Sequence, residues 1–376
     1  MIRFMEKEFS VTPWDVKGEV DYDSLIREFG VERISPELLK KMQKHAKDLH
    51  FMLRRGIFFA HRDLAWVLEH YEKGNKFFLY TGRGPSGKMH LGHLMPLVFT
   101  KWLQDVFGVE VWIQFTDDEK FLFRDKTYDE IQKQMQEDFL DVIALGFDSK
   151  KTHFLIDTKH ASLIYPEAIK VAKKLTYSTV KASFGLDESS NVGQIFYTSM
   201  QAVPAFLPSV LKGKNIPCLI PHAVDQDPHF RLTRDILPKL GHYKPASIQC
   251  TFLPPLNGMA GKMSSSTGQA IYTTDSPKEV EHKIKKYAFS GGRDTLEEHR
   301  RHGGNPDVDV SFQYLKYMFE PDDAKLHKIY QSYKSGAMTT GELKQITIDK
   351  INAFLKAHQK QRKLAEKKVG KFLYKL

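Results

Sequence analysis

The chain has 376 residues, of which 41% are hydrophobic and 27% are charged, proportions that are ordinary for a globular enzyme with more than one domain. No apolar run is long enough to cross a bilayer, and two cysteines are too few for a disulfide framework or a structural zinc site. The first residues, Met1–Glu8, carry acids and lack the apolar core of a signal peptide. We therefore expect a cytoplasmic protein that neither spans a membrane nor binds a metal of its own.

The formal net charge of +10 is concentrated near the C-terminus, where residues 356–376 carry eight Lys or Arg and one acid. A run of this kind is usually a solvated helix face. It also fits a surface that attracts a polyanion such as RNA, and charge alone does not separate the two interpretations.

In chain order, residues 1–75 are predicted to form an appended N-terminal segment. It begins with short extended stretches around Phe9–Trp14 and becomes helical from about Asp23. Helical spacing recurs over residues 36–53 and 61–71.

From Lys76 the pattern changes to strands that alternate with helices. Apolar and β-branched runs predict strands over residues 77–80, 109–115, 152–156, 217–221 and 248–253. This alternation predicts an α/β fold over residues 76–274, with a doubly wound, mostly parallel sheet and helices on both faces.

After about Thr274 the strand signals vanish. Helical patterns cover residues 278–288, 309–319, 322–334 and 340–357 and continue into the basic segment. We therefore predict a separate helical domain over residues 275–365, followed by a basic tail over residues 366–376.

A Gly-rich turn, residues 81–87, links the first predicted strand to the helix that carries His90, Gly92 and His93. A helix that starts after such a turn offers backbone N–H groups and a favourable dipole to a phosphate. The two histidines lie three residues apart, so they share one helix face and can donate to phosphate oxygens. In isolation, His-x-Gly-His is no better evidence for a ligand than for two histidines at a helix start, but its position after a strand and a turn favours a nucleotide site.

A second motif, Lys262-Met263-Ser264-Ser265-Ser266, lies between glycines and is predicted to form a loop. A lysine followed by hydroxyl groups can close over a polyphosphate. Taken alone, the same residues also fit a polar linker.

Together and in this order, the two motifs resemble the His-Ile-Gly-His and Lys-Met-Ser-Lys-Ser signatures of class I aminoacyl-tRNA synthetases. The chain is most similar to the tryptophanyl enzymes of the eukaryotic and archaeal cytoplasmic type, although Ser265 stands where many members of the class have a second lysine. The resemblance runs from Thr12 to the C-terminus. Beyond the two signatures, it rests on residues 80–86, 114–120, 225–228, 230–235 and 288–295.

The resemblance implies a Rossmann-like catalytic domain over residues 76–274 with a dimerisation insertion, an anticodon-binding helical domain over residues 275–365, and a homodimer. It also implies that tryptophan attacks the α-phosphate of ATP and is then transferred from the adenylate to the 3′-terminal adenosine of tRNA(Trp). Because the attacking carboxylate is already an anion, the first step depends mainly on positioning and charge stabilisation. Mg²⁺ is expected to arrive with ATP rather than in a protein site.

The same resemblance assigns roles to individual residues. The catalytic set, which contacts the phosphates, is His90, His93, Lys262, Ser264 and Ser266. The further ATP contacts are Arg83, Gly84, Gly92 and Met263. The tryptophan contacts are Tyr80, Gln114, Glu119, Tyr197, Gln201, Gln226 and Phe230, with Tyr80 and Gln114 accepting from the indole N–H. The anticodon contacts are Arg293 and Asp294.

Three alternatives are weighed against this interpretation. Tyrosyl enzymes of the class place an Asp three residues after the Gln that matches Gln201, whereas here that position is Pro204, which has no side-chain acceptor. A nucleotidylyltransferase shares the His-x-Gly-His chemistry but is usually shorter and needs no helical RNA-binding domain. A non-enzymatic relative usually loses motif residues, whereas His90, His93 and Lys262 are all present.

Overall fold

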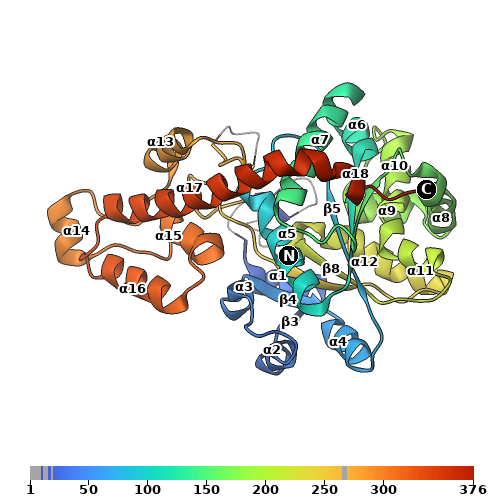
Figure 1. Ribbon diagram of the computed structural model, residues 1–376, viewed down its shortest axis with the longest axis horizontal. Coiled ribbons are helices and arrows are strands. Elements are labelled where there is room, and N and C mark those ends of the chain that lie inside the picture. The colour runs from blue at the N-terminus through green and yellow to red at the C-terminus, as the bar shows by residue number, and fades with distance from the viewer. Residues whose placement is uncertain (1–9, 12–15, 18–19, 265–268) are drawn as a thin grey trace, which may run out of the picture.

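A computed structural model describes residues 10–11, 16–17, 20–264 and 269–376, and its centre is a seven-stranded sheet (Figure 1). In spatial order the strands are β3 (Glu32–Arg33), β4 (Phe58–Arg62), β9 (Ala246–Cys250), β8 (Cys218–Ala223), β5 (Phe78–Arg83), β6 (Glu110–Phe115) and β7 (Thr152–Ile156). A separate two-stranded sheet pairs β1 (Ser10–Val11) with β2 (Val16–Lys17).

The five strands from β9 to β7 are parallel, which confirms the predicted α/β class. Their chain order reverses between β5 and β8, so the sheet winds in both directions from this point, as in a Rossmann fold. In open sheets of this kind, ligands bind outside the carboxyl ends of the strands at the reversal point. The expected place of a ligand site is therefore among the residues that follow β5 and β8.

The appended segment contributes two antiparallel strands, β3 and β4, to the same sheet. Its helices are α1 (Tyr22–Phe29), α2 (Pro36–Gln43), α3 (Phe51–Arg54) and α4 (Leu64–Glu72). The predicted helix over residues 61–71 therefore starts later than expected, because β4 occupies Phe58–Arg62. The apolar run at the start of β4 is buried, and a short run of this kind does not separate a strand from a helix by periodicity.

Helices cover both faces of the sheet and form two cores. The helices between the strands are α5 (Leu91–Phe107), α6 (Asp117–Phe123), α7 (Tyr128–Ala144), α8 (Ala161–Ala172), α9 (Tyr177–Phe184), α10 (Val192–Met200), α11 (Leu207–Leu211) and α12 (Asp227–Ile236). Short 3-10 turns are η1 (Val203–Ala205), η2 (Val224–Gln226) and η3 (Leu237–Leu240). One core packs α5 and α7 against the sheet, and the other packs α8, α10 and α12 against its opposite face.

The C-terminal part is helical, as predicted. It contains α13 (Pro277–Tyr287), α14 (Leu296–His302), α15 (Val310–Tyr314), a π-helical turn η5 (Leu315–Phe319), α16 (Asp323–Lys334), α17 (Thr340–Ala365), η6 (Glu366–Lys368) and α18 (Val369–Phe372). Figure 1 shows α13 to α16 at one end of the molecule and α17 running from them to α7. There the Arg362 guanidinium pairs with Glu137 and Asp141, and His358 Nε2 lies 2.8 Å from Asp141.

The predicted basic tail is folded onto the seven-stranded sheet. Leu373 bridges to Phe154 of β7, and the Tyr374 N–H donates to the Phe154 carbonyl at 3.1 Å. The ring centroids of Tyr374 and Trp112 are 4.9 Å apart. The backbone carbonyl oxygen of Tyr374 is 3.0 Å from His160 Nε2. The lysines of the tail are exposed around this docked segment.

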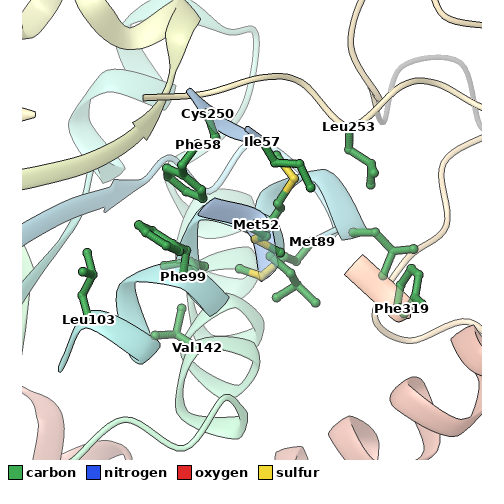
Figure 2. Close-up of a cluster of buried hydrophobic side chains, with 14 of the residues drawn as sticks. Met52, Ile57, Phe58, Met89, Phe99, Leu103, Val142, Cys250, Leu253 and Phe319 are labelled. Atoms are coloured by element: carbon green, nitrogen blue, oxygen red, sulfur yellow. The ribbon is translucent and has the colours of Figure 1, made fainter. Parts of the chain in front are cut away.

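A single apolar cluster joins the three parts of the chain (Figure 2). Met52 and Phe58 come from the appended segment, Phe99 from α5, and Phe319 from the C-terminal helices. The Phe58 and Phe99 rings stack with centroids 3.7 Å apart. No helix of the described residues is both long and apolar enough to span a bilayer.

Candidate active site

The His90 and His93 motif lies at the reversal point of the sheet. β5 ends at Arg83, and α5 begins at Leu91 with His90 in the extended conformation just before it. The two imidazole rings stack with centroids 3.6 Å apart. Gly92 packs tightly beside them, because a Cβ there would lie 3.2 Å from the His90 ring and 3.5 Å from the Met263 Cβ.

Both imidazoles are held in the neutral form. Burial, reinforced by the positive charges of Arg83 and Lys262, lowers the pKa of His90 to about 3, and burial and Arg83 also hold the pKa of His93 well below its ordinary value. The His90 backbone N–H donates to His93 Nδ1 at 3.3 Å, and Arg83 Nη1 lies 3.3 Å from His93 Nε2. Because Nδ1 accepts from the His90 N–H, the single proton of the neutral His93 ring is on Nε2, which faces Arg83.

Arg83 is itself fixed by a buried ion pair. Its Nε donates to Asp138 Oδ2 of α7 at 2.9 Å, and its Nη2 donates to the Gly87 carbonyl at 2.7 Å. Burial raises the pKa of Asp138 to about 6, against the lowering effect of Arg83. The ion pair with Asp138 of α7 therefore fixes the position of the guanidinium next to His93.

Acid is expected to destabilise the fold through His90. The unfolded chain takes up a proton at this residue below its ordinary pKa of 6.5, whereas the folded chain does so only near 3, so unfolding is favoured as the pH falls between these values. Between pH 7 and pH 4.5, urea unfolding of His90→Asn should show about 2 to 3 kcal/mol less loss of stability than the unsubstituted protein. Equal losses in the two proteins would contradict this assignment.

The second motif meets the first. Met263 is buried beside Gly92, and its N–H donates to the Leu253 carbonyl at 3.2 Å. Lys262 Nζ donates to Asp225 Oδ2 at 2.6 Å, and Asp225 lies in η2, two residues after the end of β8. Ser264 is half-buried in the same loop, whereas the predicted contact Ser266 lies outside the described residues.

Four of the seven predicted tryptophan contacts, Tyr80, Gln114, Tyr197 and Gln201, are joined by hydrogen bonds beside β5. Tyr80 and Gln114 are fully buried, and the Tyr80 hydroxyl donates to Gln114 Oε1 at 2.6 Å. Gln201 Nε2 donates to the Tyr80 oxygen at 2.9 Å, and the Tyr197 hydroxyl donates to Gln201 Oε1. Gln114 Nε2 lies 2.9 Å from each carboxyl oxygen of Asp157.

Three further predicted contacts surround this chain. Phe230 of α12 meets Tyr80 edge-on, with ring centroids 5.9 Å apart. Glu119 accepts from the Thr116 hydroxyl at 2.7 Å and pairs with Lys120, whose side chain occupies the space of a Cβ at Gly84. Burial alone would raise the pKa of Glu119, but Lys120 and Thr116 hold it below its ordinary value. Gln226 is half-buried in the turn before α12.

The predicted anticodon contacts lie elsewhere, among the C-terminal helices. Arg293 and Asp294 line an open cleft of about 500 Å³, together with Gly292, Glu298 and His302. Arg293 Nε donates to the Gly303 carbonyl at 3.1 Å. The turn that presents both residues is held by Asp309, which accepts from the Gly291 N–H at 2.9 Å.

Three acids at these sites were not among the predicted contacts. Asp138 holds Arg83, Asp225 holds Lys262, and Asp157 ends the Tyr80 and Gln114 chain. Asp157 directly follows β7, so its place at the carboxyl end of a parallel strand was a usable signal. Asp138 lies inside a helix and carried no comparable signal.

Comparison with known families identifies the class of protein. The family described as tRNA synthetases class I (W and Y) matches residues 72–356, which is most of the chain. With the doubly wound sheet and the two motifs at its reversal point, this match defines a class I aminoacyl-tRNA synthetase.

Individual relatives show which member of this class the chain resembles. A tryptophan–tRNA ligase of Sulfolobus acidocaldarius is 54% identical over 373 residues, which cover 98% of this chain and 96% of the relative. That of Thermococcus onnurineus is 50% identical over 370 residues, covering 98% and 94%. The crystal structure of Plasmodium falciparum tryptophanyl-tRNA synthetase has a TM-score of 0.89 at 41% identity, covering 94% of this chain and 97% of that one. The chain belongs to the tryptophanyl-tRNA synthetase family.

Proposed function

We propose that the protein acts as a tryptophan–tRNA ligase, which condenses L-tryptophan with ATP to tryptophanyl-adenylate and pyrophosphate and then charges tRNA(Trp). The observation that carries the proposal is the meeting of the two signature motifs, Met263 against Gly92, beside the buried Tyr80 and Gln114 pair. This arrangement provides phosphate donors and indole acceptors on the two sides of one strand terminus.

Activation of tryptophan is proposed to proceed by positioning and charge stabilisation. The amino acid carboxylate attacks the α-phosphorus, the bond to the bridging oxygen breaks, and pyrophosphate leaves. His90 and His93 hold phosphate oxygens as neutral donors, because each neutral ring keeps one N–H. Lys262, Ser264 and Ser266 hold the departing pyrophosphate, and Mg²⁺ travels with ATP as part of that substrate.

The remaining predicted ATP contacts act by shape and position. Gly84 lies against the Lys120 side chain, and Gly92 lies between the His90 ring and Met263, so these glycines let the side chains that would surround the nucleotide pack close to the backbone. Arg83 holds His93 from behind, since its guanidinium is paired with Asp138.

Selection of tryptophan is proposed to rest on acceptors for the indole N–H. Tyr80 and Gln114 are fully buried, so a substrate without a matching donor leaves a lone pair of each oxygen unfilled and is rejected. The amino and ring contacts proposed for the rest of the pocket are Glu119, Tyr197, Gln201, Gln226 and Phe230.

The direct test is ATP–pyrophosphate exchange with tryptophan, tyrosine or phenylalanine as the amino acid. Exchange with tryptophan alone, followed by charging of tRNA(Trp), is the expected result. Exchange with tyrosine but not tryptophan would overturn the specificity. Exchange without charging of any tRNA would favour a nucleotidylyltransferase instead.

Recognition of the anticodon is proposed to use the cleft lined by Arg293 and Asp294. The guanidinium donates and the carboxylate accepts, a combination suited to unstacked base edges. We expect Arg293→Ala to lower kcat/KM for tRNA charging about 10- to 100-fold, the cost of one lost base contact. ATP–pyrophosphate exchange should stay unchanged, and Arg301→Ala, an exposed arginine nearby on α14, provides the matched control. Equal losses in both variants would contradict the base contact.

A homodimer in the cytoplasm is proposed as the working form. An exposed apolar face on α8 and α10 supports association, because Tyr165 and Ile169 lie one helical turn apart and Tyr165 contacts Phe196. Sedimentation should give twice the chain mass of 43.4 kDa, and a monomer mass would remove this proposal.

A further inference from the structure

We infer that Asp157 is a positioning residue for tryptophan recognition: as the terminal acceptor of a buried hydrogen-bond chain, it keeps Gln114 and Tyr80 turned as acceptors toward the indole N–H. The inference rests on the proposed function, in which these two side chains read the indole. It adds a residue that does not contact the substrate but determines whether the contacting residues present acceptors or donors to it.

The chain of hydrogen bonds has a single direction. The Tyr197 hydroxyl donates to Gln201 Oε1, and Gln201 Nε2 donates to the Tyr80 oxygen at 2.9 Å. The Tyr80 hydroxyl donates to Gln114 Oε1 at 2.6 Å, and Gln114 Nε2 donates to Asp157, 2.9 Å from each oxygen. These side-chain bonds therefore run toward Asp157, from α10 and its C-cap Gln201 through β5 and β6, and the Tyr80 hydroxyl has a second, longer contact of 3.3 Å with the Gln201 backbone carbonyl.

Only the last member of the chain is unable to reverse its bond. A hydroxyl group and a primary amide can each donate or accept, so Tyr197, Gln201, Tyr80 and Gln114 would be equally satisfied in the opposite direction. An ionised carboxylate only accepts. Asp157 is fully buried beside Gln114, so no water competes for this bond.

Protonation of the acid pair does not change this direction. Burial and the neighbouring Asp118 raise the pKa of Asp157 well above its ordinary value, and the two carboxyl groups hydrogen-bond to each other. A proton on Asp157 is therefore shared with Asp118. Gln114 Nε2 is 2.9 Å from both Asp157 oxygens, so the oxygen without the proton can accept from it in either state.

The direction of the chain determines the chemistry of the pocket. Gln114 Oε1 has two lone pairs, and Tyr80 uses one of them, which leaves the other for a ligand donor. If the Gln114 amide were turned over, its NH₂ group would face Tyr80 and the indole N–H, and donor would meet donor. The loss of this hydrogen bond would weaken binding of any substrate with an N–H and would not affect a substrate without one.

This difference separates a positioning role from a structural one. The substrates to compare are tryptophan and β-(3-benzothienyl)alanine, in which sulfur replaces the indole N–H at nearly the same shape. The quantity to measure is the ratio of their kcat/KM values in ATP–pyrophosphate exchange. Because both substrates are assayed on one preparation, the ratio is independent of the fraction of protein that is folded.

The informative pair of variants is Asp157→Leu and Asp157→Asn, which match in shape and differ in polarity. We expect Asp157→Leu to lower the preference for tryptophan about tenfold or more, the equivalent of one hydrogen bond. Asp157→Asn should keep the preference within about threefold, because its carbonyl can accept from Gln114 and its NH₂ can donate to Asp118. If Asp157→Leu cannot be recovered folded, the smaller Asp157→Ala replaces it in the same comparison.

The control is Asp117→Asn, another buried acid of this region. Asp117 accepts from Tyr128 at 2.8 Å and from Gln132 at 2.9 Å and has no hydrogen bond to Gln114. It should leave the preference unchanged even if it lowers the melting temperature. An unchanged preference in Asp157→Leu, or an equal loss in Asp157→Asn, would overturn the inference. Failure of the proposed function is distinguishable, since the unsubstituted protein would then show no exchange with tryptophan.

Discussion

Replacement of His93 by alanine is expected to lower kcat for ATP–pyrophosphate exchange about 10²- to 10³-fold, the usual cost of removing one donor aimed at transition-state charge. His93 stacks on His90 and is braced by Arg83, so its ring is fixed before the substrate arrives. Donors that need no rearrangement stabilise developing charge most effectively. The loss should therefore appear mainly in kcat, with a smaller change in the KM for ATP.

Stability has to be measured beside the rate, because His93 is buried and its removal leaves a cavity. Urea unfolding and exchange should be compared for His93→Ala and for His61→Asn, a substitution of another buried histidine, on β4. The His61 variant is expected to lose stability and keep its kcat. Unchanged exchange in folded His93→Ala would remove this residue from the mechanism.

Replacement of Lys262 by methionine is expected to have an effect of similar size, about 10²- to 10³-fold in kcat for exchange. Methionine keeps much of the aliphatic stem and removes the only cation of the loop motif, so pyrophosphate would leave without a positive charge beside it. The substitution also leaves the nearly buried Asp225 without its partner at 2.6 Å, and stability should fall as well.

A double variant separates the two consequences. In Lys262→Met with Asp225→Asn, the unpaired charge is gone, so stability should return while kcat stays low. Lys350→Met is the control, since Lys350 of α17 pairs with the buried Glu320 at 2.8 Å among the C-terminal helices. Recovery of exchange in the double variant would show that Lys262 serves the fold and not the reaction.

Much of the fold could be predicted because its strands are apolar, short and separated by helical spacing. The strand predicted over residues 152–156 matches β7 in full, and that over 109–115 matches β6 within one residue. Among the elements that were not predicted, two were missed for opposite reasons. β4 starts in a continuous apolar run without alternation, and α14, with the sequence LEEHRRH, has almost no apolar face.

The active site could be predicted in part, because its motifs combine unusual residue types with glycines on loops. His90, His93 and Lys262 stand out for this reason. Asp138 carries no signal in the sequence, and the place of Asp157 after a parallel strand is a weaker signal than a motif, because a single acid has many ordinary explanations, of which capping is the commonest. Their importance arises only from the side chains that folding brings against them, Arg83 in one case and Gln114 in the other.

The docked tail also bears on how this protein avoids aggregation. A free edge strand is a template on which another chain can pair. β7 is one edge of the sheet, and Leu373 and Tyr374 occupy the backbone groups of Phe154 there. The opposite edge, β3, is only two residues long, and both are charged. A protein cut before residue 369 would expose the longer edge, so loss of the tail should appear first as self-association during expression.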